Sequence, residues 1–131
     1  MPKLDIDKLN WKGKTILIAE DEEINYLYLE TLLQKTGAKI LHTWNGEQTV
    51  QIVKENPNID IILMDIKMPI LDGFEATKII KQINPEIIII AQTAYTLSDD
   101  KIKCFDAGCD DYLSKPLRKN LLYQSISNFL N

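Results

Sequence analysis

Polar side chains follow several short apolar runs of this sequence, and Asp65 is the most prominent of them. It closes the apolar run at residues 61–64, and Pro69 follows four residues later. Four consecutive apolar residues indicate a strand that is buried on both faces, as in a parallel sheet. Open parallel sheets bind their ligands at the carboxyl ends of the strands. A carboxylate there would be accessible at its tip and enclosed by apolar walls, which suits a reactive acid.

Other polar residues stand at the carboxyl ends of other predicted strands. They are Glu20, Asp21, Thr93 and Lys115. If the strand order is the doubly wound 2-1-3-4-5, these side chains converge on Asp65. Three carboxylates at close range would repel one another unless a cation intervenes, and Mg²⁺ is the natural cation because it binds carboxylate, carbonyl and water oxygens.

A metal ion, an ammonium group and a hydroxyl group around one aspartate would bind the oxygens of a phosphoryl group. Lys115 would supply the ammonium group and Thr93 the hydroxyl group. Asp65 would then be the nucleophile, and the product would be an acyl phosphate. Phosphoryl transfer depends mostly on positioning and charge neutralisation, which these residues can provide.

The elements that must position these residues alternate along the chain. We expect strands at residues 15–19, 39–43, 59–64, 87–91 and 111–114, each followed by a helix, at about 22–36, 46–53, 73–83, 97–107 and from 117. Five strands alternating with five helices predict an α/β fold with a parallel sheet covered on both faces. The expected fold class is flavodoxin-like doubly wound (βα)5, in the order 2-1-3-4-5.

Helix ends and inner faces are predicted from capping residues and from apolar residues at helical spacing. Gly37 and Gly108 should end helices, while Asn45 and Asp72 should be N-caps. The predicted inner faces comprise Ile24, Leu27, Tyr28 and Leu32 in the first helix, Ala76, Ile79, Ile80 and Ile83 in the third, and Leu122, Ile126, Phe129 and Leu130 in the last. The fourth helix has only Leu97, Ile102, Phe105 and Ala107 as an apolar face, so we expect it to be loosely anchored.

Composition limits the classes of function. A chain of 131 residues is most simply one domain, preceded here by a lead-in or linker at residues 1–13 and occupying residues 14–131. The net charge of -4 disfavours nucleic acid as a partner. No apolar run approaches the length of a membrane span, and we expect no membrane contact by this segment. Cys104 and Cys109 form neither a disulfide framework nor a zinc motif, and both are expected to be buried thiols in a cytoplasmic protein.

Taken together, the motifs resemble those of the receiver domain of bacterial two-component systems, from about Lys14 to Leu130. The matching residues are Glu20-Asp21, residues 64–69 around Asp65, Asp72-Gly73, Thr93-Ala94 and Lys115-Pro116. The resemblance implies that Asp65 accepts phosphate from a phosphohistidine of a histidine kinase, and that Mg²⁺ is bound by Asp21, Asp65 and the backbone carbonyl of Lys67, with Glu20 helping through water.

The resemblance also implies the parts of a switch. Lys115 would pair with a phosphoryl oxygen, Thr93 would turn towards the phosphate, and Tyr112 would rotate into the vacated space. The surface formed by the fourth helix, fifth strand and fifth helix would then change. Glu20 replaces the aspartate often found at its position, and Lys67 and Tyr95 occupy variable positions that tune dephosphorylation.

Such a domain is either a stand-alone regulator or one part of a hybrid histidine kinase. The residues before Lys14 resemble the linkers of hybrid kinases and favour the second context, in which phosphate would pass to a histidine phosphotransfer protein. We expect a phosphoacceptor that catalyses its own phosphorylation and dephosphorylation, rather than a turnover enzyme.

Three other functions remain open from the residues alone. A Mg²⁺-dependent phosphohydrolase of the haloacid-dehalogenase type also uses a strand-ending aspartate, but that family has a second acid two residues later, where this chain has Lys67. A flavodoxin-like flavin carrier would need a Ser/Thr/Gly-rich loop where residues 20–23 are all acidic. A pseudo-receiver that only binds partners would normally lack one of the acids or the lysine.

Overall fold

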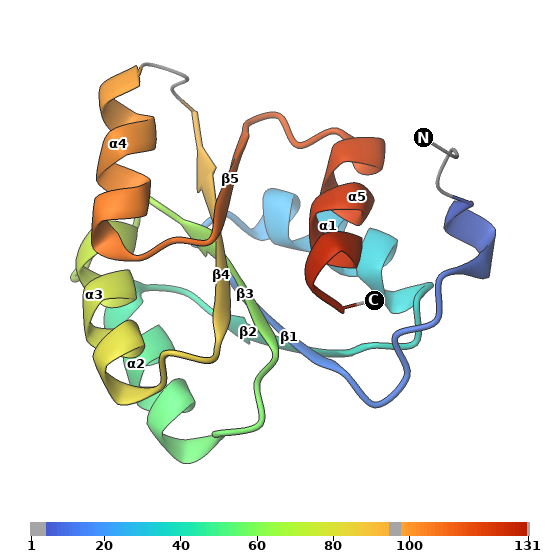
Figure 1. The fold of residues 1–131 in the computed structure, drawn as a ribbon, viewed down its shortest axis with the longest axis horizontal. Helices are drawn as coiled ribbons and strands as arrows, with labels where there is room; N and C mark the ends of the chain where they lie inside the picture. The colour runs from blue at the N-terminus through green and yellow to red at the C-terminus, as the bar shows by residue number, and fades with distance from the viewer. Residues whose placement is uncertain (1–4, 95–97, 131) are drawn as a thin grey trace.

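The chain forms a five-stranded parallel sheet between two layers of helices (Figure 1). The computed structural model describes residues 5–94 and 98–130. The strands are β1 (Thr15–Ala19), β2 (Lys39–Thr43), β3 (Ile61–Asp65), β4 (Ile88–Thr93) and β5 (Asp111–Ser114). Their order is β2-β1-β3-β4-β5, and every neighbouring pair is parallel. The predicted fold class and strand order are therefore confirmed.

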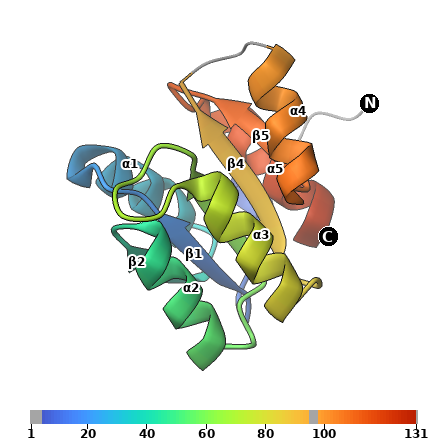
Figure 2. The same ribbon diagram turned by 90° about the vertical axis from the view of Figure 1, so that its left-hand side faces the viewer.

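Helices cover both faces of the sheet. They are α1 (Glu23–Gln34), α2 (Gly46–Glu55), α3 (Gly73–Ile83), α4 (Ser98–Ala107) and α5 (Lys119–Leu130), preceded by the short 3-10 helix η1 (Ile6–Lys8). α2, α3 and α4 lie on one face, which is turned to the viewer in Figure 2, and α1 and α5 lie on the other. No helix within residues 5–94 and 98–130 is long and apolar enough to cross a membrane.

Alternate residues of the strands contribute to two apolar cores, one on each face. Leu17, Ile62 and Ile89 point to the core beneath α2, α3 and α4. Ile18, Leu63 and Ile90 point to the core beneath α1 and α5. The three central strands are buried along nearly their whole length, which explains why they read as continuous apolar runs in the sequence.

The predicted caps and stops are confirmed. Asn45 and Asp72 each accept a hydrogen bond through the side chain from the backbone of the residue three positions later, at 2.8 and 2.9 Å. Gly37 and Gly108 have φ angles of +84° and +111°, the left-handed conformation in which helices end.

The predicted inner face of α1 was wrong except at Leu32, which is buried. Ile24 is 85% exposed, and Leu27 and Tyr28 are exposed as well. The buried residues are Leu29, Leu32 and Leu33. The helix carries two apolar stripes at i, i+3, i+4 spacing, and the sheet is covered by the C-terminal one.

Single positions in the other helices also differ from the expected pattern. Ile83 of α3, Phe129 of α5, and Ile102 and Phe105 of α4 are exposed. The inner side of α4 consists of the small residues Cys104 and Ala107, which are buried, and Leu97 lies outside the described residues. A sheet-facing helix surface built from small side chains is consistent with the expected weak anchoring of α4.

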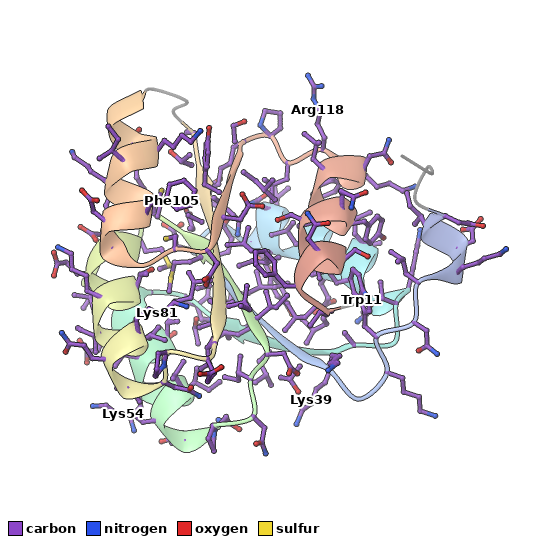
Figure 3. The ribbon with its side chains drawn as sticks, viewed as in Figure 1. Trp11, Lys39, Lys54, Lys81, Phe105 and Arg118 are labelled. Atoms are coloured by element: carbon purple, nitrogen blue, oxygen red, sulfur yellow. The ribbon has the colours of Figure 1, made fainter. Side chains whose placement is uncertain are left out.

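The segment before β1 packs against the body of the domain. Trp11 is 2% exposed, and its ring lies 6.2 Å from that of Tyr123 in α5 (Figure 3). Its backbone N–H donates to the carbonyl of Thr36 at 2.7 Å. Ile6 and Leu9 pack against the same core. Residues 6–11 therefore cover part of the α1–α5 face.

Candidate functional site

Asp65 lies at the carboxyl end of β3, in the middle of the sheet. It is 3% exposed. Its Oδ2 lies 3.1 Å from the Nζ of Lys115, and its Oδ1 accepts a hydrogen bond from the backbone N–H of Lys67 at 3.2 Å. Both oxygens of a nearly buried carboxyl group therefore have defined donors, as a positioned nucleophile requires.

Lys115 connects the end of β5 with two of the acids. Besides its contact with Asp65, its Nζ lies 3.3 Å from Oε1 of Glu20. Its backbone N–H donates to the carbonyl of Thr93 at 2.7 Å, and the following bond to Pro116 is cis. The two ion pairs hold the ammonium group beside the acids at the ends of β1 and β3.

Three carboxylates converge beside this lysine. One oxygen from each of Glu20, Asp21 and Asp65 lies within 4.8 Å of the others, with Glu20 and Asp65 buried and Asp21 exposed. Carboxylate oxygens at this spacing, open to solvent on one side, fit a hard divalent cation that retains several waters, and Mg²⁺ is such a cation. The predicted acidic cluster is thus assembled.

Burial and proximity separate the pKa values of the two buried acids. Burial and the neighbouring Glu20 raise the pKa of Asp65 from 3.8 to about 7, against the opposing effect of Lys115. Burial also acts to raise the pKa of Glu20, but hydrogen bonds from Asp65 and Asn25 and the charge of Lys115 hold it below its usual 4.5. The pKa of Asp65 in the metal-free pair therefore lies well above that of Glu20, and a bound cation would favour loss of the Asp65 proton.

An open cleft of about 660 Å³ gives access to the cluster. Asp21, Asp65, Lys67, Thr93 and Lys115 line it, together with residues that sequence analysis did not assign to the site. The predicted phosphoacceptor, hydroxyl donor and ammonium group thus share one cavity. Glu20 is fully buried behind it, in contact with Lys115.

Tyr112, the residue predicted to rotate on phosphorylation, lies outside the cleft that the described residues form. Its ring lies on the α4 side of β5, packs against that core, and makes an edge-to-face contact with Phe105 at 6.2 Å (Phe105 is labelled in Figure 3). The Nζ of Lys101 lies 5.6 Å from the centre of the same ring. Tyr112 does not line the cleft formed by the described residues, and Tyr95 lies outside those residues.

Two residues that were not predicted as part of the site support Glu20. The side-chain amide of Asn25 donates to Oε1 of Glu20, and the Nε2 of His42 lies 2.9 Å from its backbone carbonyl. The ring of His42 is stacked on that of Tyr26, with 3.6 Å between ring centres, and lies tilted against that of Trp44 at 4.2 Å. His42 therefore contacts the backbone of one of the acids of the cluster. Asn25 lies in the first turn of α1, five residues after Glu20, and this spacing gives no signal of the contact in the sequence.

Comparison with known proteins places these features in a family. The family model described as the response regulator receiver domain matches residues 16–127. Hybrid signal transduction histidine kinase I of Dictyostelium discoideum is 42% identical over 120 residues, which cover 86% of this chain and 7% of that protein. The chain therefore spans a small part of the length of this relative.

Two solved structures are similar over most of their length. The receiver domain of Saccharomyces cerevisiae Ssk1, in complex with the histidine phosphotransfer protein Ypd1, is 32% identical with a TM-score of 0.86, over 94% of this chain and 92% of that one. The receiver domain of the sensor histidine kinase PA1611 from Pseudomonas aeruginosa PAO1 is 34% identical with a TM-score of 0.82, over 89% and 97%. The latter structure contains a magnesium ion coordinated in its active site cleft.

Proposed function

Because this chain belongs to the response regulator receiver domain family, we propose that it is a phosphoryl-accepting switch of a two-component phosphorelay, with Asp65 as the acceptor. The observation that carries the proposal is the position of Asp65, a nearly buried acid at the centre of one cleft with Lys115 at 3.1 Å and Thr93 beside it. An acid in such a position is suited to nucleophilic attack within a preorganised electrostatic environment.

In the proposed step, a carboxylate oxygen of Asp65 forms a bond to the phosphorus atom of a phosphohistidine. The N–P bond breaks, its electron pair stays on the imidazole nitrogen, and that nitrogen takes up a proton. The product is an acyl phosphate on Asp65. Lys115 neutralises the charge of the phosphoryl oxygens, and the hydroxyl of Thr93 donates to one of them. Hydrolysis at the same site returns the carboxylate, so the domain would catalyse both gain and loss of its phosphate.

Mg²⁺ is the proposed cofactor, held by Asp21, Asp65 and the backbone carbonyl of Lys67, with Glu20 acting through water. The close approach of the carboxylate oxygens supports this assignment, as does the magnesium ion in the similar Pseudomonas domain. When bound, the ion would supply positive charge next to the transferred group. Lys67 stands where a phosphohydrolase of the haloacid-dehalogenase type has its second acid, so repeated hydrolytic turnover has less support.

The proposed partners are a histidine kinase, or its phosphohistidine domain, and a histidine phosphotransfer protein. The similarity to a kinase of the hybrid class and to a receiver bound to Ypd1 supports both. We place the start of the receiver domain at residue 14, and the lead-in before it packs on the α1–α5 face through Ile6, Leu9 and Trp11. The proposed localisation is the cytoplasm. Cys104 and Cys109 are free, buried thiols, as is usual in that reducing compartment.

The proposed output is a change of the α4–β5–α5 surface. Thr93 would turn towards the phosphoryl group, and Tyr112 would move into the space that it leaves. The ring of Tyr112 contacts Phe105 of α4, so its movement would alter how α4 packs on β5.

Intact-mass measurement tests the proposal. The chain is incubated with acetyl phosphate and Mg²⁺, beside Asp65→Asn and a sample with excess EDTA. The expected result is the gain of one phosphoryl group by the parent in Mg²⁺ and by neither control. No gain in the parent, or an equal gain in Asp65→Asn, would contradict the assignment of the acceptor.

A further inference from the structure

Gln92 of β4 is a fully buried amide whose side chain has no hydrogen-bond partner within residues 5–94 and 98–130. The residue is 0% exposed, and neither Nε2 nor Oε1 finds a partner among the residues that the structure describes. Buried polar side chains are almost always paired, because an unpaired amide loses its hydration without compensation. An amide at this position therefore requires an explanation other than stability of the resting state.

The position of Gln92 points to the phosphoryl site. Gln92 is the register partner of Asp65 in the β3–β4 pair, and partners in a parallel ladder direct their side chains to the same face of the sheet. The backbone carbonyl of Gln92 accepts a hydrogen bond from Ile66 at 3.1 Å, which fixes the two strand ends against each other. Gln92 also lines the cleft that contains Asp65, Thr93 and Lys115.

We propose that Gln92 is a binding residue of the phosphoryl site, and that its Nε2 donates a hydrogen bond to an oxygen of the phosphorylated Asp65 group. This inference rests on the proposed function, since it concerns the state in which Asp65 carries phosphate. In the resting state, the two oxygens of Asp65 already have donors in Lys67 and Lys115. Phosphorylation adds three strong acceptor oxygens at this point, and the amide is an unused donor beside them.

The alternative explanation is that Gln92 merely fills space in the core. The two explanations differ in what an apolar residue of similar shape does. In both cases, Gln92→Met removes an unpaired buried amide and should leave the resting domain as stable as the parent or more stable. Only the proposed contact predicts that the same variant weakens the phosphorylated state, because the donor is then lost.

The experiment compares the parent, Gln92→Met and Gln92→Leu with Ile90→Val as a matched control. Ile90 is buried on the same strand and belongs to the apolar core beneath α1 and α5. Three quantities are measured for each protein: the thermal midpoint without ligand, the affinity for Mg²⁺ alone, and the affinity for beryllofluoride, a phosphoryl mimic, in saturating Mg²⁺. The half-life of the acyl phosphate is followed in parallel by intact mass.

The expected result is an unchanged or raised thermal midpoint, an unchanged Mg²⁺ affinity, and beryllofluoride binding weakened by about five- to tenfold in both Gln92 variants, the effect of one lost hydrogen bond. Ile90→Val should bind beryllofluoride as the parent does.

Equal beryllofluoride affinity in parent and Gln92 variants would overturn the inference while leaving the proposed function intact. A loss confined to Mg²⁺ affinity would overturn it as well, because Gln92 would then act on the metal site. A parent that binds no beryllofluoride would remove the proposed function itself, and this inference with it.

Discussion

A Cβ atom on Gly73 would lie 2.4 Å from the carbonyl oxygen of Asp65, closer than any real side chain can approach. The first turn of α3 is therefore packed directly against the backbone of the acceptor. The backbone N–H of Gly73 also donates to the carbonyl of Ile66 at 2.9 Å. The absence of a side chain at residue 73 thus determines how the loop after β3 closes around the site.

Gly73→Ala is accordingly expected to disturb the site as well as the fold. We expect a loss of roughly 1–3 kcal/mol in the free energy of unfolding, because backbone atoms must shift, and a clear loss of Mg²⁺ affinity. Chemical denaturation and calorimetric titration measure the two effects. Gly13→Ala is the control: Gly13 has a φ of +88° but open space around it, so this variant should lose stability and bind Mg²⁺ normally. Unchanged Mg²⁺ affinity in Gly73→Ala would show that the contact does not shape the site.

Asp65→Asn should stabilise the metal-free domain in a pH-dependent way. The pKa of Asp65 is raised from 3.8 to about 7, so its protonated form is favoured by folding. The stability that it contributes is complete below pH 4 and is lost as the pH rises through 7. The advantage of the variant should therefore grow between these values and reach roughly 1–3 kcal/mol at pH 8.

Denaturation in EDTA at a series of pH values measures this effect, with exposed Asp106→Asn of α4 as the control. Added Mg²⁺ should stabilise the parent more than Asp65→Asn, since a ligand stabilises only the form that binds it. A variant less stable than the parent at pH 8 would show that the ionised carboxylate of Asp65 does not destabilise the resting domain.

Asn25→Ala tests whether the side-chain amide of Asn25 holds the carboxylate of Glu20 in position. Its amide donates to Oε1 of Glu20, the same oxygen that Lys115 contacts. Without it, the carboxylate can turn, and Mg²⁺ affinity should fall by about tenfold, as is usual when a supporting contact behind a metal ligand is removed. Asn128→Ala, in the last turns of α5, is the control. Full Mg²⁺ affinity in Asn25→Ala would mean that Glu20 keeps its place without this amide.

Trp11→Ala tests whether the lead-in belongs to the folded body. Trp11 is buried against Tyr123, whereas Trp44 is 44% exposed. Removal of a buried indole should cost about 3–5 kcal/mol, and Trp44→Ala much less. Urea denaturation of both variants gives the comparison. Equal, small losses would indicate that residues before Lys14 are dispensable for stability.

The site was predictable because parallel strands bring their carboxyl ends to one edge of the sheet. Asp65, Thr93 and Lys115 each stand at the carboxyl end of a predicted strand, so their convergence followed from topology alone. The buried faces of the helices were harder to predict. α1 carries two apolar stripes, and only packing decides which one contacts the sheet. The role of Asn25 and the position of Gln92 depend on distances between side chains, which spacing along the chain does not specify.

The most direct test is to identify the residue that receives phosphate from a phosphohistidine donor. The chain is mixed with a phosphorylated histidine phosphotransfer protein and Mg²⁺, treated with borohydride to reduce any acyl phosphate, and analysed by peptide mass spectrometry. We expect one reduced residue, at position 65. Reduction at Glu20 or Asp21 instead, or phosphate retained on His42, the single histidine of the chain, would contradict it.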